Sequence, residues 1–146
     1  MLAYLKIDPM NCIIDPQGSK GGLYLGNIDA AENITLLKQH SIGAVLTVAA
    51  RTGVTYHKHQ IHTHEVIKAD DVETFELRVH FAKIIGFIEE HLKKTNVLVH
   101  CFAGISRSAT AVIAYLMQCR GLTLDQALLY CKAKRKVTNP NPGFVR

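Results

Sequence analysis

The sequence predicts an α/β protein built on a mostly parallel, mixed sheet of about five strands, with helices covering both faces. Short apolar segments alternate along the chain with longer amphipathic ones, and the connections between them are short. Residues 97–99 are apolar, which is typical of a strand covered on both faces. Residues 108–118 are apolar nearly all round, which indicates a buried helix soon after that strand.

Turn and capping residues divide the chain into its expected elements. The stretch 15–22 is rich in glycine and polar residues and separates two short strands. Asp29 is expected to cap the first helix, Gly43 to close it and Thr123 to cap the last helix. In chain order we expect strands at 13–14 and 23–25, a helix at 30–40, strands at 44–49 and 61–67, a helix at 74–93, a strand at 97–100, and helices at 108–119 and 124–134.

Length and composition predict a single domain over residues 1–146. The chain is 48% hydrophobic and 20% charged, which excludes a disordered or a membrane-embedded protein. No apolar run reaches the roughly 18 residues of a membrane-spanning helix, and the N-terminus has neither a signal-peptide layout nor a myristoylation glycine. We therefore expect a cytoplasmic or nuclear monomer without a membrane anchor.

The net charge of +5 suits acidic partners. It would also suit nucleic acid, but the chain shows no nucleic-acid-binding module, so we expect no such binding. One basic cluster stands out, and we interpret it as a helix end whose cations complement the helix dipole; a docking patch for acidic substrates is the alternative. The cluster consists of Lys132, Lys134, Arg135 and Lys136.

The cysteines and histidines do not have the spacing of a metal site. Four cysteines without paired spacing predict a reducing compartment, with Cys119 and Cys131 as core residues. Alternation places His57 with His59, and His62 with His64, on shared faces of an extended segment. No carboxylate or cysteine completes a site, so we expect exposed loop or edge-strand residues and no metal. The cysteines are Cys12, Cys101, Cys119 and Cys131, and these histidines are His57, His59, His62 and His64.

The connection after the predicted strand at 97–100 carries the residues of greatest chemical interest. Cys101 and Arg107 stand six positions apart in it. Free N–H groups and the positive dipole end at a helix N-terminus suit a tetrahedral dianion, and the same field favours a thiolate at Cys101. Arg107 can offer two parallel donors to phosphate oxygens, Gly104 lets the backbone curl, and Ser108 can donate to the sulfur. The sequence therefore predicts a phosphate-binding loop that contains a nucleophile.

These residues resemble the signature of the cysteine-dependent protein phosphatases, specifically the small, atypical dual-specificity branch. The match is His-Cys, five residues, Arg-Ser, and Ser106 stands where strict tyrosine phosphatases more often have glycine. Stretches 22–27 and 138–144 resemble the opening of that domain and the segment before its last helix, so the resemblance covers roughly 10–146. It implies that the phosphate group is bound by Phe102, Ala103, Gly104, Ile105, Ser106 and Arg107, with His100 hydrogen-bonded to backbone and ordering the loop.

The chain stops at Arg146, a few residues into that last helix. A trimmed domain and a short natural form both remain open. Strict tyrosine phosphatases wall a deep pocket with an additional aromatic loop, and the stretch 15–22 offers no aromatic residue for one. We therefore expect a shallow pocket that accepts both phosphotyrosine and phosphothreonine.

The chemistry also needs an acid that protonates the leaving oxygen. Asp70 and Asp71 are the candidates, because both lie on a loop between a predicted strand and a predicted helix. The spacing before Phe81 in the family implies that Asp71 is this acid. An acidic pair before a helix can also act as a simple cap, and Asp71 can serve in both ways.

The resemblance implies a dual-specificity protein phosphatase that acts on phosphorylated proteins and needs no cofactor. Cys101 attacks phosphorus, Arg107 and the loop amides hold the equatorial oxygens, and Asp71 protonates the leaving group and then activates water against the phosphocysteine. Two alternatives remain: a phosphate-binding module without turnover, and an enzyme for a phosphoinositide or a phosphorylated glycan. The absence of lysine between Cys101 and Arg107 argues against highly charged lipid headgroups.

Overall fold

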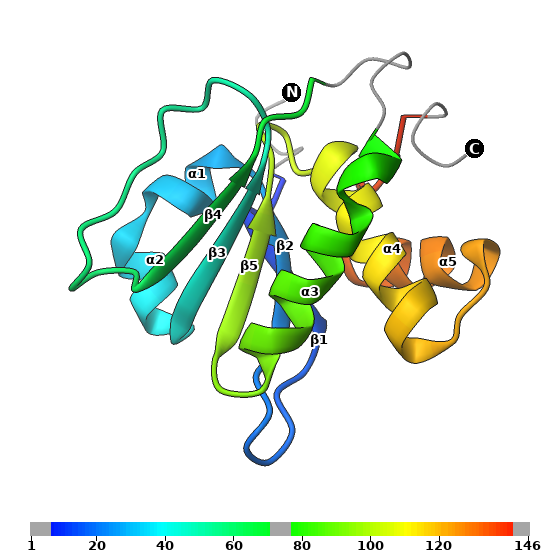
Figure 1. Cartoon of the computed structure of the whole chain (residues 1–146), viewed down its shortest axis with the longest axis horizontal. Coiled ribbons are helices and arrows are strands. Elements are labelled where there is room, and N and C mark those ends of the chain that lie inside the picture. The colour runs from blue at the N-terminus through cyan, green and yellow to red at the C-terminus, as the bar shows by residue number, and fades with distance from the viewer. Residues whose placement is uncertain (1–6, 71–76, 142–146) are drawn as a thin grey trace.

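The structure, a computed structural model, describes residues 7–70 and 77–141 (Figure 1). Its strands form one sheet in the spatial order β1-β2-β5-β3-β4. β1 pairs with β2 in antiparallel orientation, and the pairs β2/β5, β5/β3 and β3/β4 are parallel. The predicted mixed, mostly parallel sheet of five strands is confirmed. The bounds are β1 Met10–Ile14, β2 Leu23–Gly26, β3 Ile42–Val48, β4 Thr63–Ile67 and β5 Asn96–His100.

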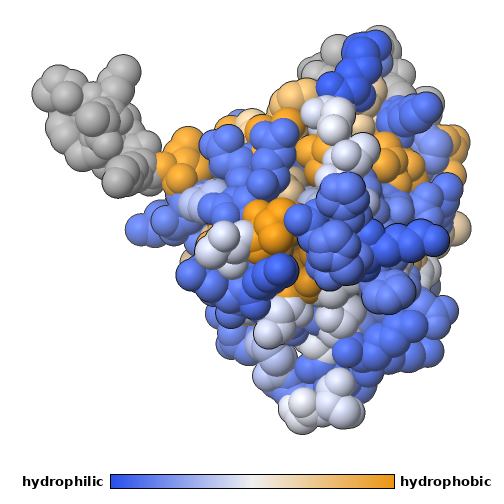
Figure 2. Space-filling model, turned by 90° about the vertical axis from the view of Figure 1, so that its left-hand side faces the viewer, coloured by the Kyte–Doolittle hydropathy of each residue, from blue (hydrophilic) through white to orange (hydrophobic). Residues whose placement is uncertain are grey.

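Helices cover both faces of the sheet (Figure 1). Two short helices, α1 and α2, lie on one face, while α3 and α4 pack on the other and α5 packs against α4 and β1. The face beside α1 and α2 is mainly hydrophilic at its surface, with small hydrophobic patches (Figure 2). Among the described residues, no helix is long and apolar enough to cross a membrane. The bounds are α1 Ile28–Glu32, α2 Ile34–Gln39, α3 Phe81–Leu92, α4 Arg107–Arg120 and α5 Leu124–Lys134.

Alternate side chains of the central strand β5 enter two separate apolar cores. Val97 and Val99 pack in the core under α3 and α4, whereas Leu98 packs in the core under α1 and α2. Because side chains alternate along a strand, His100 lies on the same face as Leu98. On the neighbouring strand, Thr47 lies on that face for the same reason, since Val45 belongs to the same core as Leu98. The two cores explain why both central strands are apolar in sequence.

The expected helix at 30–40 is wrong as a single element. The structure has two helices that meet at Asn33, whose side chain accepts a hydrogen bond from Leu36 N at 3.0 Å. Asn27, not Asp29, caps the first of them. An asparagine side chain competes with the backbone for hydrogen bonds, so it starts a new helix more readily than it continues one. Gly43 does not close the second helix either, because it lies within β3.

The other helix predictions hold where the structure describes them. A 3₁₀ turn, η2 (Leu77–His80), leads directly into α3, and residues 74–76 of the expected helix lie outside the described residues. Thr123 caps α5 as predicted, in a reciprocal capping box with Gln126. The strand β5, the loop after it and the helix α4 therefore stand in the predicted order.

Candidate active site

The loop between β5 and α4 encloses one buried sulfur atom. Sγ of Cys101 lies 3.0 Å from Ser108 Oγ and accepts the N–H of Gly104 at 3.2 Å, and the cysteine is only 2% exposed. The sulfur also lies close to the start of the 14-residue helix α4. Two hydrogen-bond donors and the positive end of a helix dipole therefore stabilise negative charge at this sulfur.

Every carbonyl group of residues 101–106 accepts a hydrogen bond from the protein around the loop. In a trans peptide the C=O and the following N–H point in opposite directions. Carbonyls tied to the surroundings therefore turn the N–H groups of residues 102–107 toward the loop interior, as the bond from Gly104 N to the sulfur shows directly. The donors are His100 Nδ1 to Cys101 (3.1 Å), Ile28 N to Phe102 (2.9 Å), Arg135 Nη2 to Ala103 (3.5 Å), Arg135 Nε to Gly104 (2.9 Å), Asn139 N to Ile105 (2.8 Å) and Thr110 N to Ser106 (2.8 Å).

Gly104 is required by the shape of this loop. Its φ of +70° lies in the left-handed region that glycine adopts without strain. A Cβ built there would lie 2.6 Å from the carbonyl oxygen of Gly26 and 2.7 Å from Arg135 Nη2. Any side chain at this position would therefore force the loop away from β2 and from Arg135.

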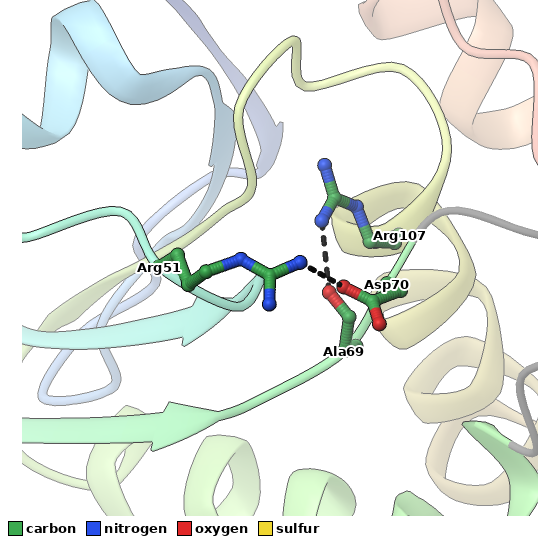
Figure 3. A network of polar contacts seen from close by, with 4 residues as sticks. All are labelled: Arg51, Ala69, Asp70 and Arg107. Atoms are coloured by element: carbon green, nitrogen blue, oxygen red, sulfur yellow. Dashed lines mark hydrogen bonds and ion pairs between the residues drawn. The ribbon is translucent and has the colours of Figure 1, made fainter.

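Arg107 stands in the first turn of α4 and reaches back over the loop. Its Nη1 donates to the carbonyl of Ala69 at 2.8 Å (Figure 3), and its guanidinium carbon lies 5.6 Å from the centroid of the Phe102 ring. Within the described part of the chain, Nε of Arg107 is buried without a hydrogen-bond partner. This side of the guanidinium is therefore available to an oxyanion in the loop.

The structure describes one of the two candidate acids, Asp70, but not the other, Asp71. Asp70 forms an ion pair with Arg51 at 3.2 Å beside Arg107 (Figure 3), and both side chains of the pair are exposed, at 51% and 84%. The carboxylate of Asp70 is thus bound to a neighbouring cation. Asp71 lies outside the described residues, so its assignment as the acid stays a prediction.

Arg135 is a site residue that the sequence analysis missed. It was expected among the cations that end a helix, and the structure places it at the end of α5 with its side chain only 1% exposed. Besides the two loop carbonyls, its Nη1 donates to Asp8 O at 2.8 Å and to Asn11 Oδ1 at 2.7 Å. Burial lowers the pKa of Arg135, while the nearby Cys101 and Asp8 oppose that shift. The chain turns back at this residue, the C-cap of α5, and nothing in the local sequence pattern distinguishes it from its lysine neighbours.

His100 binds backbone, as expected, but it also contacts residues that the sequence did not connect to it. Its Nε2 lies 2.6 Å from Thr47 Oγ1, and that oxygen lies 2.7 Å from His64 Nε2. Burial lowers the pKa of His100 to about 4; its bond to Cys101 opposes the shift and the nearby His64 adds to it. His64 lies on the edge strand β4, one of the two expected placements, but it is half-buried and hydrogen-bonded rather than exposed.

Two other expectations can be compared with the structure. In the described residues no group of three histidine, cysteine or acidic side chains could hold a metal ion. The stretch 15–22, from which we expected a shallow pocket, lies far from the loop. Gly26 pairs with His100 and Leu23 with Val97, so this stretch lies at the opposite end of the sheet from Cys101. That stretch cannot form a wall of this site, whatever its residues. Pocket depth therefore stays a prediction.

We predict that Arg135→Lys lowers the free energy of unfolding by about 1–3 kcal/mol, because one ammonium cannot satisfy both loop carbonyls and the partners near the N-terminus. Binding of inorganic phosphate should weaken with it. Urea unfolding and calorimetric titration measure the two effects. Lys134→Met is the matched control, since Lys134 is exposed on the same helix end and should change stability by less than about 0.5 kcal/mol. Equal effects of the two substitutions would contradict the role of Arg135.

We also predict a pH dependence of stability that comes from His100. Its pKa is about 4 in the folded protein and about 6.5 when unfolded, so the unfolded chain takes up the proton more readily. The stabilising contribution is complete above pH 6.5 and is lost as the pH falls toward 4. Over that window the wild type should lose about 3 kcal/mol more than His100→Gln. Denaturant unfolding from pH 4 to pH 7 tests this, with the exposed His62→Gln as the control that retains the wild-type slope.

Comparison with known proteins agrees with this site. Residues 23–146 match the family model described as dual specificity phosphatase, catalytic domain. The chain is 42% identical over 126 residues to Dual specificity protein phosphatase 1 of Arabidopsis thaliana, covering 86% of this chain and 63% of that protein. It is 39% identical over 124 residues to Dual specificity protein phosphatase 15 of Mus musculus, covering 84% of this chain and 52% of that protein.

The crystal structure of human DUSP28 superposes with a TM-score of 0.83 at 26% identity, covering 94% of this chain and 88% of that one. The chain thus spans between about half and two thirds of the length of the two curated relatives. The match over residues 23–146 includes the whole loop from Cys101 to Arg107 and the helix that follows it. This chain belongs to the dual specificity phosphatase family.

Proposed function

We propose that this chain is a dual-specificity protein phosphatase that hydrolyses phosphotyrosine and phosphoserine or phosphothreonine through a phosphocysteine intermediate. One observation carries the proposal: a buried sulfur is enclosed by a loop whose N–H groups turn inward, and Arg107 at the end of that loop has a buried guanidinium nitrogen without a protein partner in the described residues. Inward N–H groups and an arginine stabilise the spread charge of a transferring phosphoryl group. The sulfur at the base then meets phosphorus in line with the leaving oxygen.

The reaction has two steps at this sulfur. The thiolate of Cys101 forms the S–P bond as the bond between phosphorus and the substrate oxygen breaks, and that oxygen takes a proton from Asp71. Water then attacks the phosphocysteine and gives up a proton to Asp71, which releases phosphate and the thiolate. The Ser108 hydroxyl, 3.0 Å from the sulfur, donates to the sulfur as it leaves phosphorus. The part of Asp71 rests on the family resemblance.

The two alternative functions receive less support. A binding module without turnover has no need for a thiol in the loop, yet Cys101 and Arg107 are both present at its two ends. A phosphoinositide enzyme would need more positive charge at the surface of its site than the loop supplies, and one exposed cation near Arg107, Arg51, is paired with Asp70. A phosphorylated glycan remains possible chemically and is separated from protein substrates by assay.

The proposed substrates are phosphorylated proteins in a reducing compartment, the cytoplasm or the nucleus. All four cysteines, Cys12, Cys101, Cys119 and Cys131, are free thiols in the structure. A nucleophilic thiol loses its function when it is oxidised. A reducing environment therefore keeps Cys101 able to react, and net positive charge favours acidic phosphoprotein partners.

We predict that Cys101→Ser abolishes turnover of an aryl phosphate while the fold and phosphate binding persist, because an alcohol of nearly the same size is not ionised at neutral pH. Arg107→Lys should also reduce kcat/KM strongly, since a point charge does not replace two parallel donors. Cys119→Ser, at a half-buried cysteine away from the loop, is the control that keeps wild-type activity. Near wild-type turnover by Cys101→Ser would exclude the covalent mechanism.

The same preparations decide the substrate class. Phosphotyrosine and phosphothreonine peptides, a phosphoinositide and a phosphorylated glycan are offered side by side, and phosphate release is measured. We expect both peptides to be cleaved well above the other two. Cleavage of phosphotyrosine alone would overturn dual specificity and leave the chemistry of Cys101 intact.

Asp71→Asn should slow hydrolysis by about a hundred- to ten-thousandfold if Asp71 is the general acid. The loss should be larger on phosphothreonine peptides than on aryl phosphates, whose leaving groups need little protonation. Asp70→Asn is the matched control: it breaks the ion pair with Arg51 and should change kcat much less. If the two substitutions exchanged their effects, the acid would be Asp70 and the register taken from the family would be wrong by one residue.

A further inference from the structure

A chain of hydrogen bonds runs across three neighbouring strands to the backbone of the nucleophile. Nε2 of His64 on β4 lies 2.7 Å from Thr47 Oγ1 on β3, which lies 2.6 Å from Nε2 of His100 on β5. Nδ1 of His100 lies 3.1 Å from the carbonyl oxygen of Cys101. Thr47 and His100 are paired in the sheet and completely buried. The chain therefore connects a half-buried histidine outside the loop to the residue that carries the sulfur.

The direction of every bond in this chain follows from its chemistry. A carbonyl oxygen only accepts, so Nδ1 of His100 carries a hydrogen. In the neutral imidazole Nε2 then accepts, and the hydroxyl of Thr47 donates to it. That hydroxyl has only one proton, so its remaining contact requires Nε2–H of His64 as donor. The Cys101 carbonyl thus requires the Nδ1–H tautomer of His100, and all the hydrogen bonds are made only when Thr47 donates to His100 and His64 donates to Thr47.

Protonation of His100 would break this pattern. It would place an N–H on Nε2, opposite the Thr47 proton, while Thr47 Oγ1 already accepts from His64. Thr47 would have to accept from His100 as well, so its own proton would lose its acceptor unless His64 moved its hydrogen from Nε2 to Nδ1; a buried polar group without a partner is costly. The hydrogen bond from His64 to Thr47 therefore disfavours protonation of His100. A positive charge on His64 would disfavour it further.

The other groups that face His64 and His100 do not supply the hydrogen bond that Thr47 accepts from His64. Against His64 lie the ring of Tyr56, with centroids 4.9 Å apart, and Glu65 on the same strand. Tyr56 donates its hydroxyl to Ala31 O at 2.6 Å, with Glu32 near it, and Glu65 pairs with Lys83 at 3.0 Å. Burial lowers the pKa of His64 and Glu65 opposes the shift. Against His100 lie Thr47, His64 and Cys101.

We propose that His64 is a positioning residue for the phosphate-binding loop: by donating to Thr47, it holds His100 as the neutral Nδ1–H tautomer and so anchors the Cys101 carbonyl. A fixed Cys101 carbonyl keeps the N–H of Phe102 turned toward the bound phosphate. The positive field around the sulfur then comes from amides and arginines, with no imidazolium below it. The kinetic consequence rests on the proposed phosphatase activity, whereas the tautomer of His100 does not.

The test compares His64→Leu with His64→Gln in the full chain. Two-dimensional imidazole ¹⁵N spectra from pH 5 to pH 8 report tautomer and titration, and the spectrum of His100→Gln assigns the His100 resonance. In the wild type we expect protonated Nδ1, unprotonated Nε2 and no titration above pH 5.5. In His64→Leu the pKa of His100 should rise by about one unit or more, which is about the ordinary spread of histidine pKa values among proteins. The Nε2–H tautomer of His100 should also appear. His64→Gln should behave as the wild type, because its amide can donate to Thr47.

The pH profile of kcat/KM for an aryl phosphate adds a functional measure. His64→Leu should gain an ionisation between pH 5 and pH 7 that wild type, His64→Gln and the control His62→Leu lack. His62 is exposed two residues before His64 and makes no contact with Thr47 or His100 that the structure describes. If His64 had only a structural role, His64→Leu would lower stability without changing the pH profile of kcat/KM.

The outcomes separate this inference from the proposed function. An unchanged His100 resonance in a folded His64→Leu overturns the inference, whether or not the protein is an enzyme. If His64→Leu does not fold, the wild-type spectrum decides: protonated Nε2, or titration of His100 above pH 5.5, overturns it. If the wild type has no turnover but His64→Leu still shifts the His100 resonance, the proposed function is overturned and the positioning role of His64 is supported.

Discussion

The structure around the sulfur depends on one constraint: a loop that turns its N–H groups inward must turn its carbonyls outward, into protein. Six consecutive carbonyls, those of residues 101–106, each need a donor there, since an unpaired buried carbonyl costs free energy comparable to a lost hydrogen bond. The donors come from the end of β5, the start of α1, the end of α5, the segment after it and α4 itself. The phosphate-binding surface is therefore a product of the whole fold, although its residues are contiguous.

The order of the strands brings those donors together. β5 lies between β2 and β3, so the chain segments that follow β2 and β3 leave the sheet on either side of the loop. Ile28, just after β2, reaches Phe102 O, and Thr47, near the end of β3, reaches His100. Such a reversal of strand order is where open parallel sheets bind ligands, because the carboxyl ends of the strands converge there. The antiparallel β1 lies at one edge of the sheet, where its Asn11 side chain accepts from Arg135.

The sequence could predict what depends on adjacent residues. The strand, the loop and α4 follow one another in the chain, and the contacts of the Cys101 sulfur with Gly104 and Ser108 follow from that order. Contacts between segments that are distant in the sequence leave no periodic pattern in it. Arg135 looks like one more cation at a helix end, and His64 looks like one of several alternating histidines, until the fold brings each to a loop carbonyl or to Thr47. The break at Asn33 was missed because an asparagine is equally compatible with a helix interior and a new cap until its side chain is seen.

The charges around the loop are divided in a way that bears on binding. His100 stays neutral, since burial lowers its pKa to about 4, whereas arginine side chains keep their charge throughout the neutral range. Arg135 is bound only by oxygen acceptors, carbonyls and one amide oxygen, so no carboxylate among its hydrogen-bond partners cancels its charge. Positive potential from Arg135, Arg107 and the start of α4 therefore persists from pH 5 to pH 8. Across that range this potential favours a bound phosphate dianion.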